Sequence, residues 1–330
     1  MGKITILELS TEKPLYKGGI DTYIYAFEAL FHDDPDVEVL PVEYLESREI
    51  PFLKSTYKKG VVGAAIKNCD PEWVHINGYT SLSVVQSFLA AKRLNKRILY
   101  TAHWHPFNQL RHPFAGRLFF NLLIKPLVKR YADAVITINN EDTAFFKRIT
   151  SRVHQIPHWY RGKTAVNMKL RKKRMILFVG RIEDPVKGIE HLYSIPEGEF
   201  EIHCVGNGEM LERSDFHRHI NVPDDELNRL YQEASLLVVP SKYEAFSYVA
   251  LEALMAGTPV LASERVRIGD YLKDVEGFGT FCYGNYEDFI KKVRYYIGCD
   301  VDVEAVHKIF NPDLIKTKYK KVIVGNYRAL

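Results

Sequence analysis

PSKYEAFSYVALEALMAGTPVLAS, residues 240–263, keeps two carboxylates eight positions apart in a stretch that is otherwise almost wholly apolar. Its first residue closes an apolar run that predicts a strand, its middle predicts a buried helix ended by Gly257, and its last six residues predict another strand. Glu244 then lies in the loop at the helix N-terminus, and Glu252 lies about two turns into the helix. Strand, helix and strand in this order form a βαβ unit, which indicates a parallel sheet.

The same alternation of short apolar runs and longer helical patterns covers the whole chain. In the first half, the runs that predict strands are residues 3–9, 37–42, 72–76, 97–102, 133–138 and 152–156. In the second half they are residues 175–180, 200–206, 235–240, 258–263 and 279–283. A polar connector with the basic run RKKR separates the two sets near residues 158–174. The pattern therefore predicts an α/β protein of two similar open parallel-sheet halves.

Composition bounds the class of protein. The chain has 330 residues, 46% of them hydrophobic and 26% charged, which is typical of a globular protein with two domains. Its four cysteines are far apart and form no CxxC pair, so we expect reduced core thiols, no zinc site and a cytoplasmic protein. The apolar segment near the N-terminus is too short for a signal peptide, and no run is long enough to span a membrane.

The net positive charge of the chain lies in its first half. Residues 1–158 carry 20 Lys and Arg against 16 Asp and Glu, whereas residues 159–330 carry 25 of each kind. Within 111–131, a polar stripe of Arg117, Asn121, Lys125 and Lys129 lies on an otherwise apolar predicted helix. One interpretation is a core helix with one edge in solvent; the other is a helix that rests peripherally on an anionic membrane, on its inner face. We expect no nucleic-acid partner.

Glycines and cations follow the predicted strands. Gly18 and Gly19 precede an amphipathic helix, and adjacent glycines let backbone N–H groups approach an anion. The sequence RIEDPVKG follows a strand and places Arg181 and Lys187 where a diphosphate could bind. Gly206 repeats the strand-then-glycine pattern in VGNGE. No GxGxxG is present, which lowers the expectation of a dehydrogenase.

Taken together, these stretches resemble retaining glycosyltransferases of family 4, which have the GT-B fold. The resemblance is specific over 175–263, where FVGRIEDPVKG and the E-x7-E stretch lie, and diffuse over 1–158. It implies two Rossmann-like domains that face each other across a cleft. The N-terminal, acceptor-side domain would be 1–158, and the nucleotide-sugar domain 159–311. Residues 312–330 would form a helix that crosses back to the first domain.

The resemblance also implies roles for single residues. Glu244 would contact the donor sugar, Glu252 the ribose, and Arg181 and Lys187 the departing diphosphate. His103 would approach the donor sugar near the reaction centre, although the nearby His105 is an alternative. The remaining donor-binding positions would be Gly18, Gly19, Gly206, Val222, Phe246, Ser247 and Tyr248, with Ser247 standing where the family has glycine.

The expected activity is transfer of a hexose-type sugar, with retention, from a nucleoside diphosphate sugar to a hydroxyl of a glycan, a lipid-linked or a small-molecule acceptor. No cofactor or metal is expected, because we interpret both Asp-x-Asp sequences, Asp34-Pro-Asp36 and Asp300-Val-Asp302, as surface turns. Two alternatives remain open. One is a GT-B relative with other chemistry, such as a nucleotide-sugar epimerase or a phosphorylase; the other is a non-catalytic nucleotide-sugar-binding protein.

Overall fold

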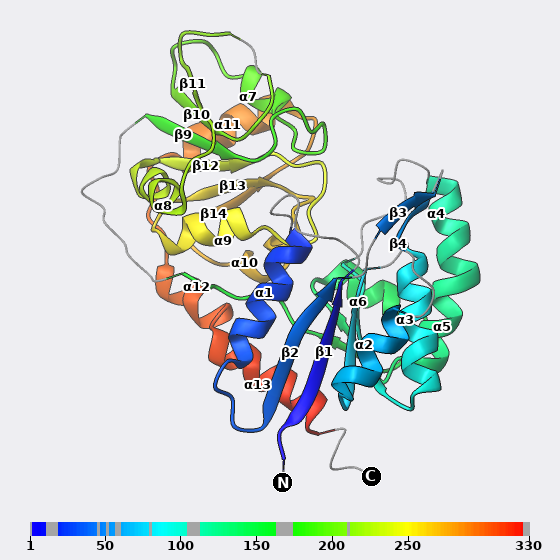
Figure 1. Ribbon diagram of the computed structural model, residues 1–330. Helices are drawn as coiled ribbons and strands as arrows, with labels where there is room; N and C mark the ends of the chain where they lie inside the picture. Colours follow the sequence, from blue (N-terminus) through cyan, green and yellow to red (C-terminus); the bar gives the residue numbers. More distant parts are fainter. Residues whose placement is uncertain are drawn as a thin grey trace. The chain divides into compact units, whose positions relative to one another are not determined.

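A computed structural model describes residues 2–10, 19–44, 47–50, 53–56, 61–78, 81–103, 113–162, 174–209 and 212–325 of the 330-residue chain. The chain divides into two compact units, shown with their elements in Figure 1. One unit combines Met1–His158 with Pro312–Leu330, and the other is Trp159–Asn311. Each unit is built on its own parallel sheet of six strands.

The sheet of the N-terminal unit has the strand order β2-β1-β5-β6-β7-β8. Its strands are β1 (Ile4–Ser10), β2 (Val37–Tyr44), β5 (Trp73–Asn77), β6 (Arg97–Thr101), β7 (Ala134–Thr137) and β8 (Val153–Gln155). The helices of this unit are α1 (Gly19–Phe31), α2 (Val61–Cys69), α3 (Leu82–Arg93), α4 (Pro113–Phe119), α5 (Lys125–Tyr131), α6 (Asn140–Lys147) and α13 (Pro312–Ile323). Helices α1 and α13 cover one face, and α2, α3 and α5 cover the other (Figure 1).

The sheet of the C-terminal unit has the order β11-β10-β9-β12-β13-β14. Its strands are β9 (Met175–Val179), β10 (Glu201–Val205), β11 (Phe216–His219), β12 (Leu236–Val239), β13 (Val260–Ser263) and β14 (Phe278–Phe281). Its helices are α7 (Glu190–Tyr193), α8 (Asp224–Glu233), α9 (Tyr248–Met255), α10 (Gly269–Leu272), α11 (Tyr286–Tyr296) and α12 (Val303–Ile309). Counted along the chain, this order is 3-2-1-4-5-6, that of the dinucleotide-binding fold.

All eleven strands that the apolar runs predict are present within a few residues of the predicted bounds. Sequence patterns missed β11 and the hairpin of β3 (Ser47–Ile50) and β4 (Leu53–Thr56). In β11, the sequence FHRH contains one apolar residue, because β11 is an edge strand and only Phe216 packs into the core. Periodicity cannot identify a strand whose remaining side chains point away from the core.

A π-helical turn, η2 (Phe120–Ile124), joins α4 to α5. Pro126 at the start of α5 has no N–H to donate, and the preceding N–H of Lys125 bonds to the carbonyl of Phe120, five residues back. Phe120, Ile124 and Val128 remain on the core side across this change. The three helical segments α4, η2 and α5 therefore follow one another directly and keep one buried face.

Helix α13 packs on α1 within the N-terminal unit. Tyr319 lies 2.9 Å from Tyr23, oxygen to oxygen, and Lys320 bonds to Asp34 at 3.1 Å and Asp36 at 2.6 Å. Burial would raise the pKa of Asp34, but hydrogen bonds from backbone N–H groups and Lys320 hold it below its ordinary value. Asp34 is only 4% exposed, so its interpretation as a surface turn residue was wrong.

Asp302 lies at a turn as expected, whereas the cysteines are not all in the core. Asp302 caps the N-terminus of α12 by accepting a hydrogen bond from the N–H of Ala305, as a turn residue would. All four cysteines are free thiols, but only Cys204 is buried and Cys282 is exposed. Core burial was therefore predicted wrongly for Cys282.

Candidate functional site

Each sheet has one topological switch point, where successive strands are added on one side of the first strand and then on its other side. In the C-terminal unit it lies between β9 and β12, and in the N-terminal unit between β1 and β5. The loops that leave two such strands turn to opposite faces of the sheet, which opens a crevice at their carboxyl ends. In the C-terminal unit these loops carry Lys187 and Glu244, so the sequence-predicted residues lie at the position that this fold uses for ligands.

Glycines let the backbone come close at this edge. At Gly206, where φ is +150°, an added Cβ would lie 1.9 Å from the carbonyl oxygen of Gly180. At Gly188, where φ is +70°, it would lie 2.0 Å from the carbonyl oxygen of Pro240. No other residue type fits either position, because both the dihedral angle and the contact exclude a side chain. The two glycines thus allow the loop after β9 to pack closely against the ends of β10 and β12.

Glu244 accepts two hydrogen bonds on the same oxygen. The ammonium group of Lys187 donates to Oε1 at 2.8 Å, and the hydroxyl of Ser241 donates to it at 2.7 Å. The Glu244 side chain is 14% exposed and that of Lys187 is 27% exposed, so the pair is half-buried but reachable. The backbone of Glu244 is held by a bridge to Val266 and by the N–H of Arg267. These backbone contacts fix the residue, and because both side-chain bonds are to Oε1, Lys187 and Ser241 hold one of its two carboxylate oxygens.

Arg181 does not join the Lys187–Glu244 pair. Its guanidinium bonds to Asp184 at 2.6 Å, and its side chain is 73% exposed. The carboxylate of Asp184 also accepts from the N–H of Val186, which shapes the loop between the two cations. Arg181 is therefore an exposed surface cation paired with Asp184 on the same loop, whereas Lys187 is half-buried and paired with Glu244.

Glu252 has different partners. The hydroxyl of Tyr231 on α8 donates to its Oε2 at 3.1 Å, and Arg161 approaches its Oε1 at 3.8 Å. Burial raises the pKa of Glu252, against the opposing effects of Tyr231 and Arg161. The Arg161 guanidinium also lies over the ring of Tyr248, 4.7 Å from its centre. The two acids of the E-x7-E stretch thus occupy separate environments.

The remaining residues that the sequence predicts to bind the donor lie in the following positions. Ser247 caps α9 and its hydroxyl accepts from the N–H of Ala250, which explains why serine can stand there. The ring of Phe246 contacts those of Tyr248 and Phe310, with both ring centres 5.6 Å away. Val222 is half-buried in the loop between β11 and α8. Gly19 begins α1, whereas Gly18 lies outside the described residues.

In the N-terminal unit, His103 ends a chain of buried polar groups. Its Nε2 lies 2.9 Å from Oδ1 of Asn77, whose amide donates to Oε2 of Glu8 at 2.8 Å. Oε1 of Glu8 contacts Nδ1 of His75, and Nε2 of His75 lies 2.8 Å from the hydroxyl of Thr101. All five side chains are buried, and Glu8 and His75 have no exposed surface.

The backbone of His103 adopts φ +45°, an uncommon conformation for a residue with a side chain. Its ring also contacts Tyr23, with ring centres 4.8 Å apart, and stacks with His158 at 6.3 Å. Strained backbone at the carboxyl end of a strand is a feature of functional sites. The alternative, His105, lies outside the described residues.

Sequence reasoning missed several partners in both units. Glu8 carried one signal, because a charge inside the apolar strand ITILELS requires a buried partner. His75 and Asn77 alternate in EWVHIN and therefore share a face of β5. Tyr231 and Arg161 carried no such signal, because their contacts with Glu252 depend on how α8 and the segment after β8 fold.

The helical stretch α4–η2–α5 exposes two rows of side chains. The polar row is that of Arg117, Lys125 and Lys129. Beside it, Phe114 is 80% exposed, Leu118 49% and Leu122 64%. Across the described residues, no helix combines the length and apolar character that crossing a bilayer requires.

Comparison with known proteins adds a family match over part of the chain. Residues 173–298 match the family described as Glycosyl transferases group 1. An uncharacterized glycosyltransferase of Methanocaldococcus jannaschii is 39% identical over an alignment of 126 residues that covers 33% of this chain and 32% of that protein. The aligned stretch therefore spans about a third of this relative.

Solved structures resemble the chain over nearly its whole length. A sucrose-phosphate synthase from Thermosynechococcus elongatus superposes with a TM-score of 0.72 at 18% identity, over 99% of this chain and all of that one. The Anabaena protein HepE, in complex with UDP and glucose, superposes with a TM-score of 0.71 at 14% identity, over 98% and 100% of the two chains. Together with the two six-stranded parallel sheets, these likenesses confirm the GT-B fold.

Proposed function

We propose that this chain, a GT-B protein whose residues 173–298 match Glycosyl transferases group 1, transfers a hexose-type sugar with retention from a nucleoside diphosphate sugar to a hydroxyl acceptor. The observation that carries the proposal is the Lys187–Glu244 pair at the switch point of the second sheet. The likeness to a protein that holds UDP and glucose supports the donor class.

The proposed chemistry uses charge rather than a covalent intermediate. When the bond between the sugar and the diphosphate breaks, negative charge grows on the leaving phosphate. Lys187 is anchored beside that position, and Arg181 can swing toward it from the surface. A preorganised cation such as Lys187 stabilises the transition state more than the ground state. The acceptor oxygen bonds to the anomeric carbon on the face from which the diphosphate leaves, and the leaving diphosphate accepts the acceptor's proton. Because the new bond forms on the face of the old one, the anomeric configuration is retained.

The two acids divide the donor between them. Glu244 has Oε1 held by Lys187 and Ser241, so Oε2 can accept a hydrogen bond from a sugar hydroxyl. Glu252, with Tyr231 and Arg161 beside it, receives the ribose hydroxyls. His103, held by Asn77, presents its ring to the donor sugar. Gly19, Gly206, Val222 and the residues 246–248 complete the nucleotide site.

Donor screening tests the proposal. Thermal-shift measurements with UDP, GDP and ADP, and with the free nucleosides, should show one diphosphate that raises the melting temperature more than its nucleoside. The matching sugar nucleotide should then release its diphosphate only with an acceptor present. NMR of the product should show the anomeric configuration of the donor. A product of inverted configuration would contradict retention.

The alternatives differ in their co-substrate. An epimerase would convert the sugar nucleotide without an acceptor, and a phosphorylase would require inorganic phosphate. A non-catalytic binding protein would bind the donor without turnover. The cations and both carboxylates, which binding alone does not require together, favour transfer.

We also propose that transfer needs no metal, since Lys187 and Arg181 already supply positive charge to the diphosphate. Asp34, Asp36 and Asp302 serve structural contacts instead. Turnover should survive EDTA. Loss of activity on chelation, restored by magnesium or manganese, would contradict this mechanism.

The exposed surface of α4–η2–α5 supports peripheral attachment to an anionic membrane, where a lipid-linked acceptor would be reached. Phe114, Leu118 and Leu122 can enter the interface while Arg117, Lys125 and Lys129 contact lipid phosphates. Each cation near such a surface contributes about 1 kcal/mol.

Sedimentation with vesicles tests the attachment. The protein should pellet with phosphatidylglycerol vesicles at low salt and stay in solution with phosphatidylcholine vesicles. The Leu118→Ser/Leu122→Ser variant should lose the apolar part of binding, and Arg117→Ser/Lys125→Ser/Lys129→Ser the salt-dependent part. Equal sedimentation of all three proteins would contradict a role for this surface.

A further inference from the structure

One face of the edge strand β11 carries two histidines, and these lie beside a histidine and a glutamate of the neighbouring strand β10. The strands are parallel, with His203 paired to His217 and Val205 to His219. Because side chains alternate along a strand, Glu201 and His203 of β10 share a face with His217 and His219 of β11. The opposite face carries Ile202, Cys204 and Phe216, which pack into the core.

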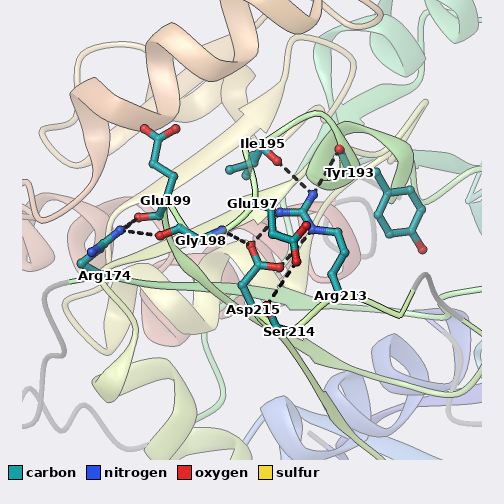
Figure 2. A network of polar contacts seen from close by, with 9 residues as sticks. All are labelled: Arg174, Tyr193, Ile195, Glu197, Gly198, Glu199, Arg213, Ser214 and Asp215. Carbon is teal, nitrogen blue, oxygen red and sulfur yellow. Dashed lines mark hydrogen bonds and ion pairs between the residues drawn. The ribbon is translucent and has the colours of Figure 1, made fainter.

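A network of polar contacts fixes β11 against the body of the unit just before these histidines (Figure 2). Arg213 forms two bonds to Asp215, at 3.0 and 2.6 Å, and a further bond to the carbonyl of Ile195 at 2.9 Å. The N–H of Gly198 donates to Asp215 at 2.9 Å. Burial would raise the pKa of Asp215, but these donors hold it below its ordinary value. An edge strand that is held in this way presents its side chains at defined positions.

We infer that Glu201, His203 and His217 form a binding site for a divalent transition-metal ion of the zinc type, with His219 as a positioning residue. One ligand atom from each of the three lies within 4.8 Å of the others. Nε2 of His203 lies 4.0 Å from a carboxylate oxygen of Glu201. Ligands of a tetrahedral zinc ion, with bonds of about 2.0–2.1 Å, lie about 3.4 Å apart.

Small side-chain rotations would bring the ligand atoms from these separations to the spacing that zinc requires. The His203 side chain is 11% exposed and fixed, whereas that of Glu201 is 62% exposed and His217 is exposed as well. The buried histidine thus defines the position of the ion, and the two exposed ligands rotate onto it. Solvent supplies the fourth ligand, because the site opens at the edge of the sheet.

His219 sets the tautomer of His203. Nδ1 of His203 lies 2.9 Å from Nε2 of His219, and the two ring planes are within 20° of each other with centres 5.1 Å apart. If Nδ1 of His203 donates this hydrogen bond, its Nε2 carries the lone pair and faces Glu201. Metal-ligating histidines use their second nitrogen in this way, and the partner orients the ring.

The donor atoms select the ion. Two imidazoles and one carboxylate suit zinc and its neighbours, whereas magnesium and calcium prefer oxygen ligands. Cys204 cannot contribute, because it lies on the other face of β10 and packs into the core. The ion would join the edge strand β11 to β10, and it takes no part in the transfer chemistry proposed above.

Calorimetric titration of untagged, EDTA-stripped protein with ZnCl2 tests the site. Wild type should bind one ion, and His217→Ala should bind at least about 100-fold more weakly. The control His307→Ala removes an exposed histidine on α12 and should bind as wild type does. Cobalt should give the visible absorption of a tetrahedral ion in wild type and not in His217→Ala, and MgCl2 should give no heat of binding.

The positioning role of His219 needs its own readout. His219→Ala should weaken zinc binding about 10- to 100-fold, the scale for a residue that orients a ligand, and His219→Gln should restore part of it by accepting the same hydrogen bond. If His203→Ala does not fold by circular dichroism, His217→Ala and Glu201→Gln, both at exposed positions, decide the outcome. Zinc binding of unchanged affinity in these two variants would overturn the inference.

Discussion

Glu8 and Glu244 occupy comparable positions in the two units, each at the switch point of a six-stranded parallel sheet. Glu8 lies inside strand β1, is fully buried, and contacts His75 and Asn77. Glu244 lies in the loop after β12, remains 14% exposed, and pairs with Lys187 and Ser241. The first acid joins strands together and orients a chain of groups that ends at His103. The second is held by one oxygen at a place that a ligand can reach.

The difference concerns what each acid can do in a reaction. A buried acid with both oxygens engaged cannot exchange partners without leaving polar groups unsatisfied. A half-buried acid paired with lysine can exchange one partner for a substrate hydroxyl, because water and the ligand compensate for it. We therefore expect the N-terminal acid to control stability and the C-terminal acid to control turnover.

The largest expected effect is on the stability of the N-terminal unit. Glu8→Ala leaves the ring of His75 and the amide of Asn77 without their buried acceptor, and should lower the free energy of unfolding by about 3–5 kcal/mol. Urea unfolding followed by circular dichroism measures this. Glu8→Gln should recover part of the loss, and Glu38→Ala, at an exposed position of β2, should change it by less than about 0.5 kcal/mol. A Glu8→Ala protein as stable as wild type would remove the distinction between the two acids.

The corresponding change in the C-terminal unit should affect the reaction. Glu244→Ala should lower kcat by about 10²- to 10³-fold, the scale for one lost contact in the transition state. Its stability should change little, because Lys187 can reach solvent. Steady-state kinetics with the donor found by screening provides the measurement. Glu183→Ala, an exposed acid in the loop between the cations, is the control and should keep full activity. If Glu244→Ala kept the same kcat as the fully active control Glu183→Ala, Glu244 would be excluded from the reaction centre.

The two cations should differ from each other. Lys187→Ala removes an anchored charge and should weaken nucleoside diphosphate binding about 10- to 100-fold, with little effect on the nucleoside. Arg181→Ala removes an exposed charge and should weaken it only a few-fold. Calorimetry with both ligands, with the exposed Lys242→Ala as control, separates these effects. Losses of the same size for nucleoside and diphosphate would show that neither cation meets the phosphates.

The smallest effect concerns Glu252, whose pKa is raised chiefly by burial. Because its folded pKa lies above the unfolded value, its contribution to stability is present below the unfolded pKa and is lost as pH rises through the folded pKa. Glu252→Gln, which mimics the protonated form, should thus gain stability relative to wild type as pH rises.

Binding of the nucleotide should show the opposite preference. Glu252→Gln should bind it about 3- to 10-fold more weakly at pH 7, because only the ionised side chain accepts from both ribose hydroxyls. The ratio of the two dissociation constants, variant to wild type, should shrink as pH falls through the pKa of Glu252. Titration of the phosphate affects both proteins alike. A ratio that does not change with pH would separate Glu252 from the ribose.

Much of the molecule could be predicted along the chain. Apolar periodicity placed eleven strands of the two sheets, because buried parallel strands are continuous apolar runs. The stretch 240–263 indicated the position of both acids, since a strand, a loop and a helix determine it locally. Lys187 was found for the same reason: it follows β9 in a short loop.

The tertiary structure decided what each of these groups contacts. Strand pairing brings Glu8 to His75, 67 residues away, and the fold of α8 brings Tyr231 to Glu252. Strand β11 carried no periodic signal, yet its pairing with β10 places His217 beside His203. The sequence by itself determined where strands and helices follow one another along the chain, and the acids and cations of the second half, because burial and turn chemistry act between near neighbours. Partners distant in sequence depend on strand order, register and helix placement, which arise only when the sheets assemble.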